Sequence, residues 1–352
     1  MCAHKPPANF MSSNTPVPLA QNFVVGRVSP ANPVLLAPMS GVTDLAFRRI
    51  AARLGAGLVV SEMVASRELA TADDEARLRA EGEGLGVHVV QLAGRDPSWM
   101  AEAARVAVGA GASIVDINMG CPAKKVVGGH GGSALLKDLD LATRLIAATV
   151  AAVDAPVTVK MRLGWDADSI VAPELAARAE AEGVAMVTVH GRTRAQFYEG
   201  RADWGAIRAI VDRVSIPVVA NGDLVAVEDA PAMLQASGAD AVMIGRGAQG
   251  RAWFPGMVAA HLAGRQVKAP DLDMQRDLAL EHYEGLLALY GRDVGVRHAR
   301  KHLGWYIDAA AASAGTPVPA ALKAAAQSAP TAEEARSAFV AAYDKLGWRA
   351  AA

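Results

Sequence analysis

Short runs of apolar and β-branched residues alternate with Ala-rich stretches between about residue 33 and residue 250. Apolar side chains at helical spacing predict helices in the Ala-rich stretches, several of which end at a glycine. The intervening runs are almost wholly apolar, as expected for parallel strands that are covered on both faces. The predicted strands span residues 34–38, 58–61, 87–92, 114–118, 157–162, 186–190, 218–221 and 241–244.

This strand–helix order indicates an α/β fold, and eight such units fit a (β/α)8 TIM barrel of roughly 250 residues. A doubly wound sheet is the alternative. That fold usually begins with a G-x-G-x-x-G turn after the first strand, and residues 37–41 (APMSG) lack this pattern. We therefore predict a TIM barrel.

After about residue 264 the β-like runs stop, and helical spacing continues over 274–290, 296–312, 319–328 and 331–346. Thr331 followed by Glu334 predicts a capping box at the start of the last helix. The predicted organisation is a disordered leader over residues 1–21, a TIM-barrel catalytic domain over 22–264 and a small all-α helical domain over 265–352.

Composition limits the classes of protein that fit. A hydrophobic fraction of 52% with 20% charged residues predicts a globular chain. The net charge of −1 argues against a globally basic nucleic-acid binder, although a local basic face is compatible with it. Two cysteines, Cys2 and Cys121, leave no disulfide framework, and no apolar stretch reaches the roughly 18 residues of a membrane span. We predict a cytoplasmic protein and expect a monomer.

In a TIM barrel the functional groups lie at the C-terminal ends of the strands. Polar residues interrupt or follow the apolar runs at that end of six predicted strands, which packing alone does not explain. These residues are Gln91, Asn118, Lys160, Arg162, His190, Arg192, Asn221, Asp223 and Arg246.

Cys121 follows the predicted strand 114–118 and precedes the glycine-rich stretch 128–132. A free cysteine is often a small buried hydrophobe. At the rim of a barrel the same thiol can act as a nucleophile or, because a pKa of about 8.5 keeps it protonated at neutral pH, as a proton donor. Residue type alone leaves both roles open. Lys160 interrupts an apolar strand in a barrel without edges, so we expect it to face a cofactor ring or an anionic intermediate.

Two glycine-containing turns follow the last two predicted strands, at residues 221–223 (NGD) and 245–247 (GRG). Glycines let backbone N–H groups close on a phosphate, and the loops after strands seven and eight form the usual phosphate site of a TIM barrel. The two turns together predict a phosphorylated cofactor or substrate.

The segment 291–302 (GRDVGVRHARKH) in the helical tail is basic. A solvated helix face is the usual explanation of such a run, and contact with nucleic-acid phosphates is the alternative. Trp305 and Tyr306 follow directly, and we expect them to fill the helical core. The cations of the run are Arg292, Arg297, Arg300 and Lys301.

In order and spacing these motifs resemble those of the tRNA-dihydrouridine synthases. The resemblance covers about residues 22–350, and RKHLGWY at 300–306 is similar to the bacterial DusB (NifR3-like) branch. The motifs that carry it are APM at 37–39, Gln91, NMGCP at 118–122, Lys160, HGR at 190–192, NGD at 221–223 and GR at 245–246.

The resemblance implies an FMN-dependent enzyme that uses NADPH to reduce the C5=C6 bond of D-loop uridines in tRNA, without a metal. Cys121 would be the catalytic acid, supplying a proton to uracil C5 while flavin N5 delivers a hydride to C6. The implied FMN contacts are Ala37, Pro38, Met39, Gln91, Lys160, His190, Asn221, Gly222, Asp223, Gly245 and Arg246. The implied substrate contacts are Asn118 and Arg192 at the target uracil or its flanking nucleotide and, at the tRNA backbone, Arg292, Arg297, Arg300 and Lys301.

Two other functions fit part of the sequence. A flavin barrel acting on a small molecule, such as a dihydroorotate dehydrogenase or an ene-reductase, would need no basic helical tail. A non-catalytic RNA-binding protein would have no use for Cys121, Lys160 and His190. The tail and the intact rim residues therefore favour reduction of a uridine in RNA.

Overall fold

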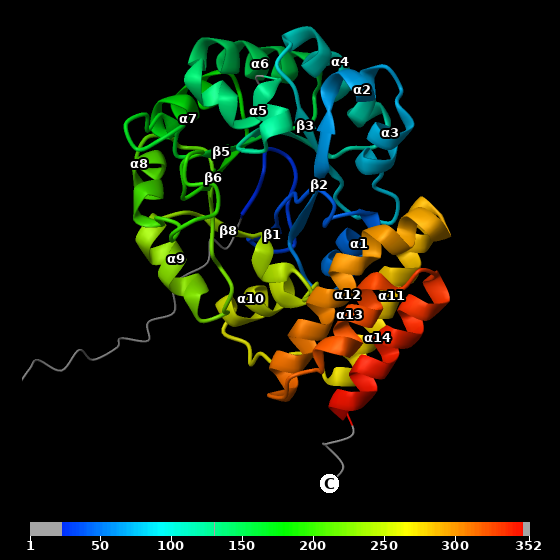
Figure 1. Ribbon diagram of the computed structural model, residues 1–352. Helices are drawn as coiled ribbons and strands as arrows, with labels where there is room; N and C mark the ends of the chain where they lie inside the picture. The colour runs from blue at the N-terminus through cyan, green and yellow to red at the C-terminus, as the bar shows by residue number, and fades with distance from the viewer. Residues whose placement is uncertain (1–22, 130, 348–352) are drawn as a thin grey trace, which may run out of the picture.

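Eight parallel strands close into a barrel in the computed structural model, which describes residues 23–129 and 131–347 (Figure 1). Each strand pairs with its neighbour in the chain, and β1 pairs with β8 to complete the ring. The predicted TIM barrel is therefore confirmed. The strands are β1 (Val34–Leu36), β2 (Leu58–Ala65), β3 (Val89–Ala93), β4 (Ile114–Met119), β5 (Val157–Arg162), β6 (Met186–His190), β7 (Val218–Asn221) and β8 (Ala241–Ile244).

Helices surround the barrel and cover the outer face of its strands (Figure 1). Aspartates begin several of them by accepting a hydrogen bond from a backbone N–H of the first turn, as Asp44 does from Phe47 at 3.0 Å. These helices are α1 (Leu45–Arg53), α2 (Ser66–Ala70), α3 (Asp74–Ala80), α4 (Pro97–Gly109), α5 (Lys124–Gly128), α6 (Leu139–Ala152), α7 (Ala172–Ala181), α8 (Arg208–Val211), α9 (Asp229–Ser237) and α10 (Phe254–Leu262).

Strand β4 shows how the barrel becomes polar toward its functional end. Side chains of a strand alternate between its two faces, so Val115, Ile117 and Met119 pack outward in the cluster shared with the helices. The inward positions begin with Ile114, which belongs to the apolar cluster inside the barrel. They continue with Asp116 and Asn118. The barrel is thus apolar at its N-terminal end and polar at its C-terminal mouth.

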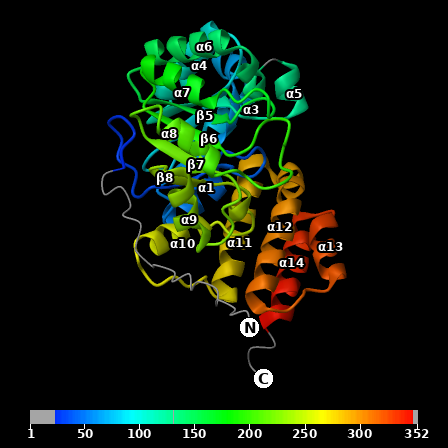
Figure 2. The ribbon, with the colours of Figure 1, turned by 90° about the vertical axis from the view of Figure 1, so that its left-hand side faces the viewer.

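The chain after the barrel forms four helices, as predicted, which pack beside α1 (Figures 1 and 2). Tyr306 is buried there, as predicted, and the N–H of Glu334 bonds to Thr331 Oγ1 at 3.2 Å, as a capping box requires. The helices share one hydrophobic cluster with the barrel. The domain boundary at 264/265 stays a prediction. The four helices are α11 (Leu272–Tyr290), α12 (Arg292–Ala314), α13 (Ala320–Ser328) and α14 (Ala332–Gly347).

Some predictions fall outside the described residues. The predicted disordered leader lies in residues 1–22, and His130, for which the sequence indicated no role, is also outside them. Within the described part of the chain, none of the helices is both long and apolar enough to cross a membrane.

The contact between α11 and α1 leaves no room for a side chain at Gly285. A methyl group there would lie 2.5 Å from Cβ of Ala46. We expect Gly285→Ala to lower the free energy of unfolding by about 1–3 kcal/mol, because neither methyl group can move without shifting a helix. Denaturant titration measures the change. Gly109→Ala at the end of α4, where an added methyl meets no atom within 4 Å, is the control and should be neutral or stabilising. Equal stability of the two variants would contradict the prediction.

Candidate active site

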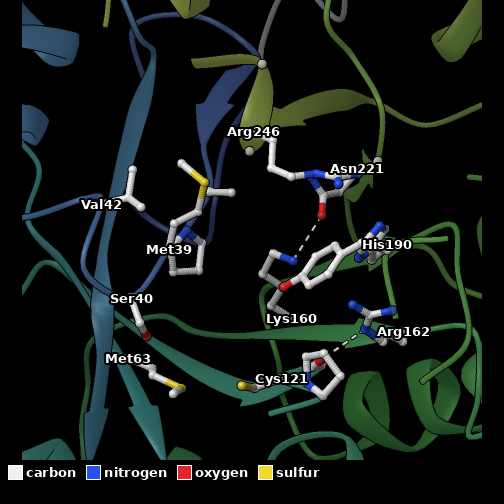
Figure 3. A pocket seen from close by; sticks show the side chains of 18 of the residues that line it. Met39, Ser40, Val42, Met63, Cys121, Lys160, Arg162, His190, Asn221 and Arg246 are labelled. Carbon is white, nitrogen blue, oxygen red and sulfur yellow. Dashed lines mark hydrogen bonds between the residues drawn. The ribbon is translucent and has the colours of Figure 1, made fainter. Parts of the chain in front are cut away.

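A cavity of about 680 Å³ opens at the C-terminal ends of the strands (Figure 3). Cys121, Asn118 and all of the predicted FMN contacts line it. Arg192 and the four cations of the helical tail are not among its lining residues. Further lining residues that were not predicted as contacts include Ser40, Met63, Arg162, Phe197, Tyr198 and Arg251.

A chain of hydrogen-bonded side chains, called the floor here, supports the cavity: Gln91 and Asn118 line it, and Asp116 and Thr158 are buried beneath them. Thr158 Oγ1 and Gln91 Nε2 donate to the two carboxylate oxygens of Asp116 at 2.5 and 2.6 Å. Asn118 Nδ2 donates to Gln91 Oε1 at 2.8 Å, and Asn118 Oδ1 accepts the N–H of Cys121 at 3.0 Å. The floor therefore fixes the backbone from which the thiol of Cys121 extends.

Asp116 is the member of this floor that sequence reasoning missed. It stands alone among apolar neighbours of β4, and only its inward position, two residues before Asn118, signals its place. Burial raises the pKa of Asp116 to about 6, against the opposing effect of the hydrogen bonds from Gln91 and Thr158. The pKa of this carboxyl group therefore lies within about one unit of neutral pH, and a small change of pH alters its charge.

Lys160 provides a positive charge on the cavity wall (Figure 3). Its Nζ donates to Asn221 Oδ1 at 3.0 Å, and Asn221 Nδ2 donates to the carbonyl of Met243 at 2.8 Å, which fixes the amide. Burial, with the nearby charge of Arg162, lowers the pKa of Lys160 to about 8. At neutral pH the ammonium group remains mostly protonated, and so it can bind an anionic or electron-rich group.

His190 lies nearly buried at the end of β6, beside this cation. Burial lowers its pKa to about 2, and the surrounding cations, Lys160 and Arg162 first among them, act in the same direction. The ring is therefore neutral. Its Nε2 lies 3.3 Å from Nη1 of Arg192, so the bare nitrogen accepts from the guanidinium and Nδ1 carries the proton.

Arg192 lies behind the cavity wall and not on it. Its side chain is 1% exposed and pairs with both carboxylate oxygens of Asp223 at 2.9 and 2.5 Å. The remaining N–H groups donate to the carbonyls of Glu199 and Gly200. These partners account for the whole guanidinium, which therefore braces the loop after β6. The predicted contact of Arg192 with the uracil or its flanking nucleotide stays a prediction.

Arg162 presents its guanidinium to the cavity instead (Figure 3). Its Nε donates to the carbonyl of Gly120 at 2.9 Å, and Nη1 donates to the carbonyls of Thr193 and Phe197 at 2.8 Å. The ring of Tyr198 packs over it at 5.4 Å from the carbon of the guanidinium. Arg162 thus links the Cys121 loop to the loop after β6 while it lines the cavity.

The two predicted phosphate-binding turns lie together on the cavity wall. Gly222 has a φ of +126°, and a methyl group there would lie 2.6 Å from Cβ of Ala202. A methyl group on Gly247 would lie 2.3 Å from the carbonyl oxygen of Leu224. Both positions require glycine, and the guanidinium of Arg246, about half exposed, stands beside them. The turns form a cradle whose backbone and charge suit a phosphate.

Cys121 is half-buried on the cavity wall, away from Arg246 in the view of Figure 3. Burial raises the pKa of the thiol, and the cations Arg162 and Lys160 only partly offset this. Its carbonyl accepts from the N–H and the hydroxyl of Ser133 at 3.1 and 2.9 Å, which fixes the loop. The thiol is therefore protonated at neutral pH.

The tail cations lie on α12, away from the cavity wall. Arg292 pairs with Glu333, and Arg300 donates to the carbonyl of Ala329 at 3.2 Å, whereas Arg297 is exposed. Lys301 is the one that approaches the cavity: a methyl group on Gly41 would lie 2.5 Å from its Nζ. Contacts between these four residues and tRNA remain predictions.

A closed (β/α)8 barrel whose mouth combines a phosphate cradle, a neutral imidazole, a cation and a thiol fits an enzyme that binds a phosphorylated cofactor or substrate. The profile of the family described as Dihydrouridine synthase (Dus) matches residues 35–343. The chain belongs to this family.

Relatives within the family cover most of the chain. It is 58% identical over 290 residues to a probable tRNA-dihydrouridine synthase of Rhizobium leguminosarum bv. phaseoli, covering 82% of this chain and 90% of the relative. It is 50% identical over 285 residues to tRNA-dihydrouridine synthase B of Xanthomonas campestris pv. campestris, covering 80% and 86%.

Among solved structures, histamine dehydrogenase from Rhizobium sp. 4-9 matches with a TM-score of 0.55 and 12% identity, covering 93% of this chain and 64% of that one. This likeness concerns the fold alone.

The raised pKa of Asp116 predicts a pH-dependent stability. The unfolded carboxyl ionises near its ordinary pKa of 3.8 and the folded one near 6, so the contribution of this group is intact below pH 4 and declines as the pH rises to about 6. About 3 kcal/mol is lost over that interval. Asp116→Asn should remove this loss, because the amide keeps the shape and the Thr158 hydroxyl can turn to accept from it. The free energy of unfolding at pH 4 and pH 7 tests this, and an unchanged difference in the variant would contradict it.

Proposed function

We propose that the chain is an FMN-dependent tRNA-dihydrouridine synthase that uses NADPH to reduce the C5=C6 bond of D-loop uridines. The observation that carries the proposal is the shared cavity of Cys121, Lys160 and the glycine cradle. A neutral thiol, a cation and a phosphate-binding turn within one space suit a reaction that adds a proton to a base beside a phosphorylated cofactor.

The cavity fits FMN in size and in donor groups, since cofactor pockets measure about 300–1,000 Å³. Gly222, Gly245 and Arg246 would hold the phosphate. Bound flavin would supply the hydride that reduces the uracil. The ring and its side chain would be held by Ala37, Pro38, Met39, Gln91, Lys160, His190, Asn221 and Asp223.

Cys121 would donate the proton to uracil C5. A general acid must hold its proton until it is needed, and burial keeps this thiol protonated. The hydrogen bond from its N–H to Asn118 Oδ1 fixes the backbone of the donor. Transfer leaves a thiolate, which the nearby charges of Lys160 and Arg162 stabilise. The uracil gains one proton and Cys121 regains one from solvent.

Arg162 would stabilise the negative charge that develops on the uracil carbonyls during reduction. It lines the cavity next to the Cys121 loop, whereas the guanidinium of Arg192 lies behind the wall and is paired with Asp223. Asn118 also lines the cavity, but its side chain already bonds to Gln91 and to the Cys121 backbone. We therefore assign the main polar contact with uracil to Arg162.

A uridine within folded tRNA must leave its stack to enter this cavity, at a cost of a few kcal/mol. Arg297 and Lys301 on α12 would offset that cost by binding the tRNA backbone near the mouth. Contacts with the phosphate backbone determine which uridine is placed at the mouth, and they do not read the base sequence.

The purified protein should be yellow, and the released chromophore should have the mass of FMN. Reduction by NADPH and by NADH, followed at the flavin absorption band, distinguishes the two reductants. A colourless protein that takes up no added FMN would refute the proposal.

Cys121→Ala tests the role of the thiol. Flavin binding and its reduction by NADPH should be unchanged, and formation of dihydrouridine in tRNA should fall by roughly 10²–10⁴-fold, the usual contribution of a general acid. Cys121→Ser is the matched control for size: its hydroxyl is a far weaker acid, so it should be similarly impaired. Full product formation by either variant would remove the proton-donor role.

A further inference from the structure

A buried polar cluster lies outside the cavity, where the start of α1 meets α11 and α12 (Figure 1). It consists of Asp44, His282, His302 and Tyr306, none more than 4% exposed. His282 Nε2 lies 3.0 Å from Asp44 Oδ2, and His282 Nδ1 lies 3.2 Å from the hydroxyl of Tyr306. Sequence reasoning assigned no role to Asp44, His282 or His302.

His302 extends this cluster to the barrel. Its Nε2 lies 3.1 Å from the carbonyl oxygen of Gly41. Burial lowers the pKa of His302 to about 3, so the ring is neutral, and a carbonyl can only accept. The proton is therefore on Nε2, and His302 donates to Gly41. Nδ1 of the same ring is buried and has no partner among residues 23–129 and 131–347.

Gly41 belongs to the loop between β1 and α1, which forms one side of the cavity. Its neighbours Met39, Ser40 and Val42 all line that space. The N–H of Gly41 donates to the buried carboxylate of Glu62 on β2. The backbone of Gly41 is thus held by the barrel through its N–H and by helix α12 through its carbonyl.

We propose that His302 is a positioning residue for the flavin reaction, acting through Gly41 to fix the β1–α1 loop against the cofactor. Helix α12 then completes the active-site wall in addition to any contact with RNA. The inference rests on the flavin site proposed above. Displacement of a positioned group by about 1 Å can cost on the order of 10²-fold in rate, so one hydrogen bond at this loop has a measurable effect.

A metal ion is the other occupant that the cluster suggests, since ligand atoms of Asp44, His282 and His302 lie within 4.8 Å of one another. The existing hydrogen bonds argue against it. They use both nitrogens of His282 and one nitrogen of His302. The Asp44 oxygens accept from His282 and from the N–H of Phe47. Within the part of the chain that the structure describes, only Nδ1 of His302 in this cluster remains free, and one free ligand does not make a metal site.

The test compares three variants of the full chain. His302→Met removes the donor and keeps the bulk. His302→Gln restores a donor, because its amide nitrogen reaches the position of Nε2. Gln275→Met is the control, since it removes buried hydrogen bonds to Pro270 and Ser313 within the helical region without touching the β1–α1 loop.

His302→Met should weaken FMN binding and slow flavin reduction by NADPH, each by about tenfold or more, in the absence of tRNA. It should also speed hydrogen–deuterium exchange over residues 38–43, a readout that needs no flavin. His302→Gln should return all three to within about threefold of the wild-type values. Gln275→Met should lower the melting temperature and leave all three unchanged.

Wild-type behaviour of His302→Met in FMN affinity, reduction and exchange would overturn the proposal. So would a His302→Gln variant as impaired as His302→Met, because the donor would then not be the cause. If the wild-type protein contained one equivalent of a metal ion and His302→Met contained none, the cluster would be a metal site and the positioning role would be refuted. Failure of the wild type to bind FMN would refute the proposed function instead, and the exchange measurement would still decide whether His302 fixes the loop.

Discussion

The placement of several positive charges in the poorly solvated mouth of the barrel is the constraint on which the rest of the structure depends. A buried cation is costly unless oxygen atoms surround it. Arg192 meets this need with the carboxylate of Asp223 and with loop carbonyls, and Arg162 meets it with carbonyls of the loops after β4 and β6. Lys160 pairs with Asn221 from β7. The same bonds that solvate the cations therefore hold three loops in place, those after β4, β6 and β7.

Two hydrogen-bonded assemblies then support the cavity from different sides. The floor from Thr158 to Asn118 fixes the backbone of Cys121, and the cluster around His302 fixes the loop of Gly41. The first lies within the barrel and the second joins it to the C-terminal helices. Removal of those helices would consequently disturb the cavity as well as any contact with RNA. Truncation at residue 265 therefore does not separate support of the cavity from RNA binding. Single substitutions are the better test.

The sequence predicted the barrel and about half of the residues that line the cavity, because strand ends and glycine turns follow from local patterns. It missed Asp116, since one acidic residue inside an apolar strand gives no sign of the inward network that accommodates it. It placed Arg192 at the substrate and left Arg162 without a role. Arg162 ends β5 and Arg192 follows β6 at the same rim of the barrel. Only their hydrogen-bond partners in the folded chain place Arg162 on the cavity wall and Arg192 behind it.

By itself the sequence determined the strand order, the polar ends of the strands and the presence of a lone thiol after β4, because hydrophobic periodicity acts over short distances along the chain. Only the tertiary structure decided which charges face the cavity, and it alone brought His302 to Gly41 across 261 positions. The physical reason is that desolvation and hydrogen-bond partners are set by whichever residues fold nearby, and these need not be neighbours in sequence.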